Sequence, residues 1–159
     1  MKRHHTFLAA VLLLAAAATL TGCLDDDTSP HDPTATRLLA AKINGTEWTA
    51  ISPTATRIVP PAAMTVVGSG DGTQLTLNIR AAAIGTYQLG GTTHVAICRH
   101  NGTEFTTKQA GAKGNITITA YDEANKLISG NFTFTARTAA GESLTVNGGR
   151  FVNVKWAEQ

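Results

Sequence analysis

The chain has little of what disulfide-rich, nucleic-acid-binding and membrane-spanning proteins need. Its two cysteines, Cys23 and Cys98, are too few for a disulfide framework. Only 15% of the 159 residues are charged and no basic cluster occurs. This composition argues against a nucleic-acid partner, because such proteins bind the phosphates with clustered basic residues. The longest apolar run, from Phe7 to Leu20, is shorter than the roughly 20 residues that a transmembrane helix needs.

The short apolar run has the features of a secretory leader. Lys2 and Arg3 precede it, and the small residues of Thr21-Gly22-Cys23 follow it, an order typical of a signal peptide. Three aspartates at 25–27 argue against a retained helix, because carboxylates at a hydrocarbon edge are costly. Removal of the leader takes two of the 13 basic residues, so 11 basic and 11 acidic residues remain. We therefore expect a nearly neutral mature chain.

The end of the leader, Leu20-Thr21-Gly22-Cys23, resembles the processing site of bacterial lipoproteins. This resemblance implies cleavage after Gly22 and lipid attached to Cys23. Lipid chains contribute about 0.8 kcal/mol per buried methylene, so several chains anchor a protein stably. We expect a signal peptide at 1–22, a lipidated cysteine with an acidic, proline-containing tether at 23–36, and one domain at 37–159.

The residues after the cysteine bear on location. Leu24-Asp25-Asp26-Asp27 resembles the acidic export tag of Bacteroidota surface lipoproteins, although that tag has a polar residue where Leu24 stands. The alternative interpretation is a solvated acidic start to the tether. Both interpretations predict an outer-membrane lipoprotein, exposed on the cell surface in the first and facing the periplasm in the second.

Apolar residues recur with a period of two in the rest of the chain, which is typical of half-buried strands. They are Leu39, Ala41 and Ile43; Leu75, Leu77 and Ile79; Ile116, Ile118 and Ala120; Ile128, Phe132 and Phe134; and Val152, Val154 and Trp156. Asn44-Gly45 and Asn101-Gly102 predict tight hairpins, whereas Pro53 to Ala63 predicts a loop. Phe151 is out of phase, and a bulge near Gly148-Gly149 would turn it inward.

This pattern predicts an all-β fold. The expected architecture is an antiparallel β-sandwich of about nine or ten short strands joined by hairpins, with a small closed β-barrel as the alternative. We expect Trp48 and Trp156 to fill its core, since aromatic side chains dominate the core area of small β domains.

Two segments resemble those of a domain-of-unknown-function family of small Bacteroidota lipoproteins. The first is Ser129-Gly130-Asn131-Phe132-Thr133-Phe134, of the form Ser-Gly-x-Phe-x-Phe, and the second is Gly149-Arg150-Phe151, of the form Gly-x-Phe. Other resembling stretches, among them Ala41 to Ala50 and Gly85 to Leu89, occur in the same order. The resemblance implies an all-β extracytoplasmic lipoprotein and supplies no catalytic residues.

Few residues suggest a site. Cys98 and His100 share strand parity and could offer a thiolate and an imidazole to zinc or copper. The alternatives are the solvent-facing side of a strand that runs into the Asn101-Gly102 turn, and a buried Cys98. His94 lies too far along the same strand to join them. Tyr121 is out of phase with Ile116 and Ile118, so it is a candidate for stacking on a sugar. No catalytic residue and no cofactor is predicted.

These observations favour a lipid-anchored, non-enzymatic binding or structural module of the cell envelope. Its partners would be the membrane, through the lipid on Cys23, and a protein or glycan, with no nucleic acid. Two alternatives stay open. One is a barrel that carries a small ligand, and the other is an enzyme or metal-handling protein whose site assembles from distant residues.

Overall fold

The computed structural model describes residues 36–60, 62–81 and 83–159, and their regular structure is entirely β-strand. The predicted leader, Cys23 and the acidic tag lie outside these residues. None of the described residues forms a helix long and apolar enough to cross a membrane. The strands are β1 Leu38–Ile43, β2 Thr46–Thr49, β3 Thr54–Ile58, β4 Ala63–Gly70, β5 Thr73–Ile79, β6 Gly85–Leu89, β7 Val95–His100, β8 Thr103–Thr106, β9 Lys113–Asp122, β10 Leu127–Arg137 and β11 Ser143–Glu158.

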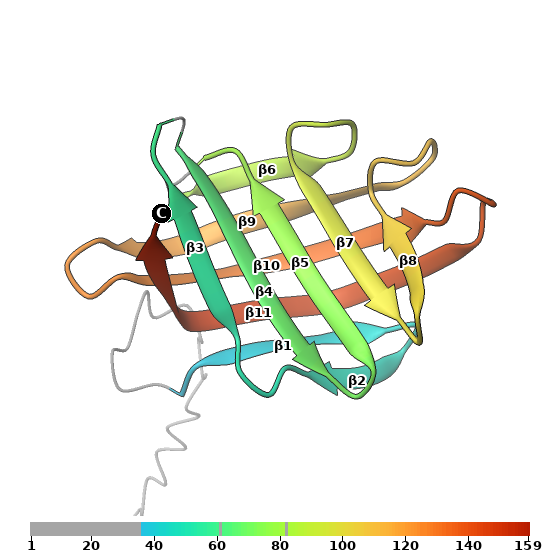
Figure 1. Cartoon of the computed structure of the whole chain (residues 1–159), viewed down its shortest axis with the longest axis horizontal. Coiled ribbons are helices and arrows are strands. Elements are labelled where there is room, and N and C mark those ends of the chain that lie inside the picture. Colours follow the sequence, from blue (N-terminus) through green and yellow to red (C-terminus); the bar gives the residue numbers. More distant parts are fainter. Residues whose placement is uncertain (1–35, 61, 82) are drawn as a thin grey trace, which may run out of the picture.

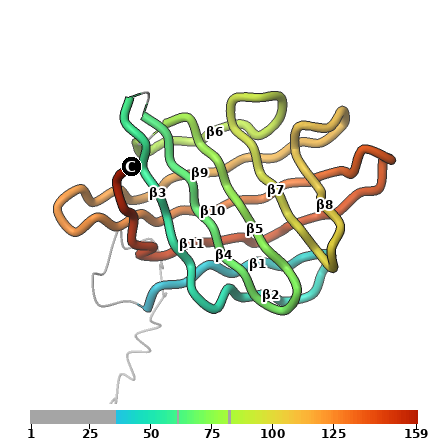
Figure 2. The backbone as a smooth tube through the Cα atoms, in the orientation of Figure 1, coloured from blue at the N-terminus to red at the C-terminus, as the bar shows by residue number. Residues whose placement is uncertain are grey.

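Hydrogen bonds join all the strands into one sheet, in the order β2-β1-β11-β3-β4-β5-β7-β8-β10-β9-β6. A further pairing of β10 with β11 connects seven of the strands into a ring. In Figure 1, the layer of β3, β4, β5, β7 and β8 crosses in front of the layer that contains β9, β10 and β11, and the tube in Figure 2 shows the same two layers. The all-β, two-layered prediction is confirmed.

Three details differ from the sequence-based expectation. The sheet has eleven strands, and one pairing, between β11 and β3, is parallel. β3 lies in the stretch from Pro53 to Ala63 that we expected to be a loop. It forms because β4 and the end of β11 supply hydrogen-bonding partners on both of its sides, although only Ala55 of its side chains is buried.

The space between the layers is filled by the residues that the period of two assigned to the core. Both tryptophans are buried as predicted. The fully buried side chains include those of Leu39, Leu75, Leu77, Ile116, Ile118 and Ile128. Trp48 also donates a hydrogen bond from Nε1 to the Gly70 carbonyl oxygen at 2.8 Å. On the outer faces threonines are frequent, as in the 2.9 Å hydroxyl contact between Thr86 and Thr117.

β11 has two bulges that change which of its residues face the core. Between Val146 and Gly149, two residues of β11, Asn147 and Gly148, oppose the single residue Thr133 of β10, and Gly148 has a φ of 56°. This is the predicted bulge, and it turns Phe151 fully inward. A second bulge, at Asn153 with a φ of 48°, restores the even parity for Val154. Val152, which the simple alternation placed in the core, lies between the bulges and is only half-buried.

The two family-like segments meet in reciprocal contacts between glycine and phenylalanine. Gly130 of β10 is opposite Phe151 of β11, and Phe132 of β10 is opposite Gly149 of β11. A Cβ added to either glycine would collide with the facing aromatic ring. The glycines are therefore required so that both rings can lie flat against the neighbouring backbone.

The hairpin predictions are confirmed. Asn44 and Asn101 have φ values of 48° and 49°, and the glycines that follow them have 86° and 82°. Positive φ at both central residues is the requirement of the tight hairpin turn for which Asn-Gly is favoured.

A double-mutant cycle tests the reciprocal contacts. We expect Gly149→Ala to lower the free energy of unfolding by about 1–3 kcal/mol, because the new methyl group overlaps the Phe132 ring. Phe132→Leu should relieve part of that loss, by about 1 kcal/mol in the cycle. Gly130→Ala is the matched control: it also meets the Thr117 backbone oxygen, so Phe151→Leu should not relieve it. Equal coupling in the two cycles, measured by urea unfolding, would contradict this account.

Candidate functional site

The two residues considered for a metal site have different environments. Cys98 lies opposite Leu75 in the core and is 0% exposed, and burial raises the pKa of its thiol to about 11. Sulfur binds metals as the thiolate, so the folded protein presents a protonated thiol here. The described part of the chain holds no group of three or more His, Cys, Asp or Glu side chains that could hold a metal ion.

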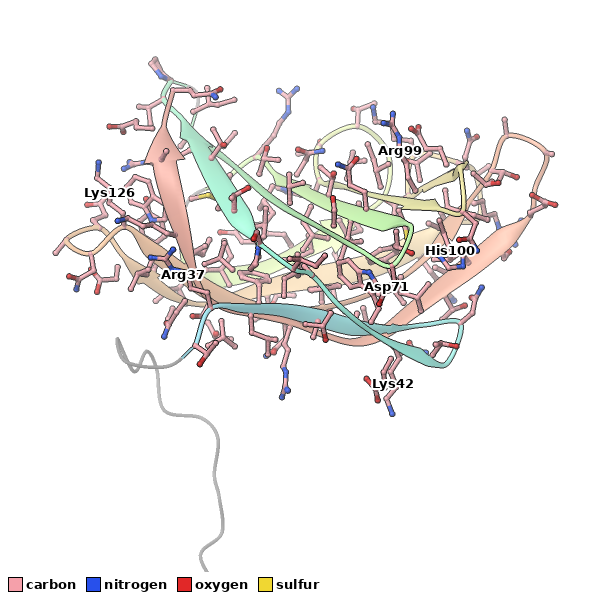
Figure 3. The ribbon with its side chains drawn as sticks, turned by 60° about the horizontal axis from the view of Figure 1, so that its bottom comes forward. Arg37, Lys42, Asp71, Arg99, His100 and Lys126 are labelled. Carbon is pink, nitrogen blue, oxygen red and sulfur yellow. The ribbon has the colours of Figure 1, made fainter. Side chains whose placement is uncertain are left out.

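His100, at the end of β7 beside the β4–β5 turn (Figure 3), contacts two polar side chains. Its Nδ1 is 2.8 Å from Thr73 Oγ1, and its Nε2 is 3.3 Å from Asn101 Nδ2. These two contacts engage both ring nitrogens of His100 and hold the imidazole beside the β4–β5 turn.

His94 lies at the opposite end of β7 from His100, so the strand does not bring the two imidazoles together. Its Nδ1 accepts a hydrogen bond from the backbone nitrogen of Arg80 at 3.2 Å. Its ring lies 5.1 Å from the ring of Tyr87, centroid to centroid. These contacts account for His94 as a structural residue beside the β5–β6 connection.

Tyr121, the candidate for sugar stacking, is half-buried and packed. Its ring is stacked on Trp156, with the centroids 5.8 Å apart and the planes 6° from parallel. The Arg57 guanidinium lies 5.9 Å from the Tyr121 ring centroid and forms a 3.0 Å ion pair with Glu123. Burial raises the pKa of Tyr121, against the opposing effect of Arg57. Trp156 therefore covers one face of the Tyr121 ring.

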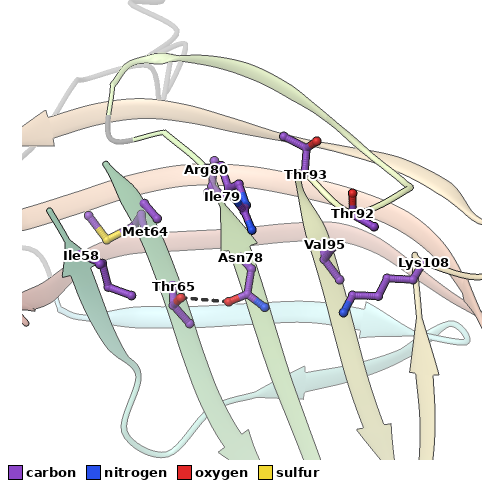
Figure 4. A pocket seen from close by; sticks show the side chains of 11 residues that line it. Ile58, Met64, Thr65, Asn78, Ile79, Arg80, Thr92, Thr93, Val95 and Lys108 are labelled. Atoms are coloured by element: carbon purple, nitrogen blue, oxygen red, sulfur yellow. Dashed lines mark hydrogen bonds between the residues drawn. The ribbon is translucent and has the colours of Figure 1, made fainter. Parts of the chain in front are cut away.

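A hollow with a volume of about 480 Å³ lies elsewhere, at the ends of β3 and β5 and the starts of β4 and β7. We call it the outer groove (Figure 4). It extends over β3, β4, β5 and the start of β7, and the connections before β7 and after β8 complete it. Volumes of about 300–1,000 Å³ are typical of sites for small molecules.

One part of the outer groove is apolar. Ile58 at the end of β3 is 42% exposed, and Ala63 and Val95 line the groove with it. Val95 is opposite Asn78 in the register of β5 and β7, so both face outward, and yet Val95 is only 4% exposed. The groove walls, rather than the core, therefore cover this valine.

The remainder of the outer groove is rich in hydrogen-bond donors. Thr65 Oγ1 donates to Asn78 Oδ1 at 2.9 Å, which leaves the Asn78 amide nitrogen directed to the groove as a donor. Arg80 lies beside it, and Lys108 extends across β7 toward Asn78 in Figure 4. Neither cation has an ion-pair partner within the described residues, and no lining residue is acidic.

Comparison with known proteins identifies the family. The family described as a domain of unknown function, DUF6252, matches residues 35–155, which contain ten whole strands and most of β11. The chain belongs to the DUF6252 family. No curated protein and no solved structure matches the chain. The expectation of a family of unknown function is confirmed, and the family adds no activity to the geometry described above.

The outer groove of this DUF6252 domain could not be found from motif spacing. Arg80 and Lys108 lie on different segments, and Asn78 belongs to a strand that reads as ordinary alternation. They line one groove only because β5 and β7 are neighbours and the connection after β8 returns beside β7.

The buried thiol predicts a pH dependence of stability for this DUF6252 domain. Because burial raises the pKa of Cys98 from 9.0 to about 11, its contribution is complete below pH 9 and is lost as the pH rises to about 11. We expect the wild-type protein to lose about 2–3 kcal/mol more than Cys98→Val over this window, measured by urea unfolding. Parallel pH profiles of the two proteins would refute the role of the thiol.

Proposed function

We propose that this DUF6252 chain is a lipid-anchored lipoprotein of the bacterial cell envelope and acts as a non-enzymatic binding module. The observation that carries the binding role is the outer groove. It is lined by apolar side chains and by hydrogen-bond donors such as Asn78, Arg80 and Lys108, and the strands that form it pack on the hydrophobic core. The enclosed, protonated thiol of Cys98 supports a role without thiolate chemistry.

The anchor in this proposal is Cys23, within the lipoprotein-like segment Leu20-Thr21-Gly22-Cys23. β1, which follows the tether, runs along the lower side of the domain in Figure 1, whereas the groove lies toward the upper ends of β4 and β5. Attachment from the β1 side would leave the groove open to ligand. A protein or glycan partner would approach from the same open side.

Packing of the core argues against the carrier alternative. The centre between the layers is occupied by large side chains that are fully buried, including Phe151, Leu39 and Met64. A ligand carried inside the fold would need to displace them, at a cost of about 2–5 kcal/mol for each large side chain removed from the core. We therefore place ligand binding on the outside of the sheet.

The anchor is tested by replacing the predicted lipidation site. We expect Cys23→Ala to abolish incorporation of labelled palmitate and to leave an unprocessed precursor, because the lipid acceptor sulfur is absent. Cys98→Ser is the matched control and should label like the wild type, since Cys98 is buried in the domain. Normal labelling of Cys23→Ala, or label lost in the control alone, would refute the anchor.

The acidic tag is tested separately. We expect replacement of Asp25, Asp26 and Asp27 by alanine to abolish protease accessibility on intact cells while leaving palmitate labelling unchanged. Alanines at Thr28 and Ser29, which alter the same tether without removing charge, should leave accessibility as it was. Unchanged accessibility after loss of the aspartates would favour the periplasm-facing location.

A further inference from the structure

We propose that the outer groove binds a small organic anion, with a carboxylate or phosphate head and an apolar body. The inference rests on the proposed function as a binding module and adds the chemical class of the ligand. It combines three features of the groove, which are its charge, its donors and its apolar wall.

The charge of the groove is positive and uncompensated. Three cations of the domain, Lys42, Arg57 and Arg99, each pair with a glutamate within 3.0 Å. Arg80 and Lys108 have no such partner within the described residues, and none of the side chains that line the groove is acidic. An anionic head between them would gain charge-assisted hydrogen bonds, which are stronger than neutral ones.

The polar groups of the groove favour an acceptor. The Asn78 carbonyl oxygen accepts from the Thr65 hydroxyl at 2.9 Å, so the donors that this side chain offers are its amide protons. Thr92 and Thr93 add hydroxyl groups at the mouth. A carboxylate or phosphate accepts from all of these groups, whereas an ammonium group would find few acceptors and two repelling cations.

The apolar side chains of the groove favour a ligand with an organic body over a free inorganic ion. Ile58 is 42% exposed and lies on the groove with Ala63 and Val95. Covering such a side chain gains about 25 cal/mol per Å² of apolar surface removed from water. The groove volume of about 480 Å³ accommodates an organic body beside the charged head.

The test is equilibrium dialysis of the full-length chain, purified in detergent, against four probes. Benzoate carries both features, benzamide lacks the charge, benzylammonium reverses it, and acetate lacks the apolar body. We expect benzoate to bind about tenfold more tightly than benzamide, because two cations contact its head. Acetate should bind more weakly than benzoate, and benzylammonium should not bind. Blank micelles correct for partition of each probe into detergent.

Variants locate the binding. We expect Arg80→Gln and Lys108→Gln each to weaken benzoate binding by about three- to tenfold, and the double variant to reduce it to the level of benzamide. Lys155→Gln on β11 removes the same charge from an exposed position outside the groove and should leave binding unchanged. Thr93→Trp, at an exposed position on the groove mouth, should block benzoate and benzamide alike.

The outcomes separate the inference from the proposed function. Benzamide binding as tightly as benzoate, with both blocked by Thr93→Trp, would overturn the anionic ligand and leave the binding module standing. Benzoate binding that the double variant does not weaken would also overturn the inference, as would no binding of any probe. The palmitate and protease experiments test the anchor independently of all these results.

Discussion

The pairing of β10 with β11 is the constraint on which the rest of the structure depends. It lies within the layer of β9, β10 and β11 and closes the ring of seven strands. Its register includes two bulges that bring Phe151, Val154 and Trp156 inward. Reciprocal contacts, with Phe151 over Gly130 and Phe132 over Gly149, require both glycines. The same strand β11 then pairs in parallel with β3 and so supports the strands that form the groove.

Close packing has a functional consequence. Because large apolar side chains fill the space between the layers, polar chemistry is confined to the outer faces and the strand connections. Buried polar side chains, such as Ser129 and Asn153, bond to one another within the frame. A frame of this kind holds surface side chains at fixed separations, which suits recognition of a ligand at the outer groove.

Periodicity and turn chemistry predicted most of the fold. Alternation predicted the core residues, Asn44-Gly45 and Asn101-Gly102 predicted their hairpins, and the parity of Phe151 predicted a bulge. Local pattern was insufficient for β3, which exists because its neighbours supply hydrogen bonds. Local pattern was also insufficient for Val152, because the second bulge is at Asn153 and no glycine in the sequence indicates it.

The sequence by itself determined the all-β class, the inward face of most strands and the absence of a disulfide framework, because these follow from local spacing and from composition. Only the tertiary structure decided that β11 closes the sheet, that Cys98 is enclosed, and that Arg80 and Lys108 share one groove. Strand order is a long-range property: hydrogen bonding between distant segments brings such residues together, and no local pattern encodes which strands become neighbours.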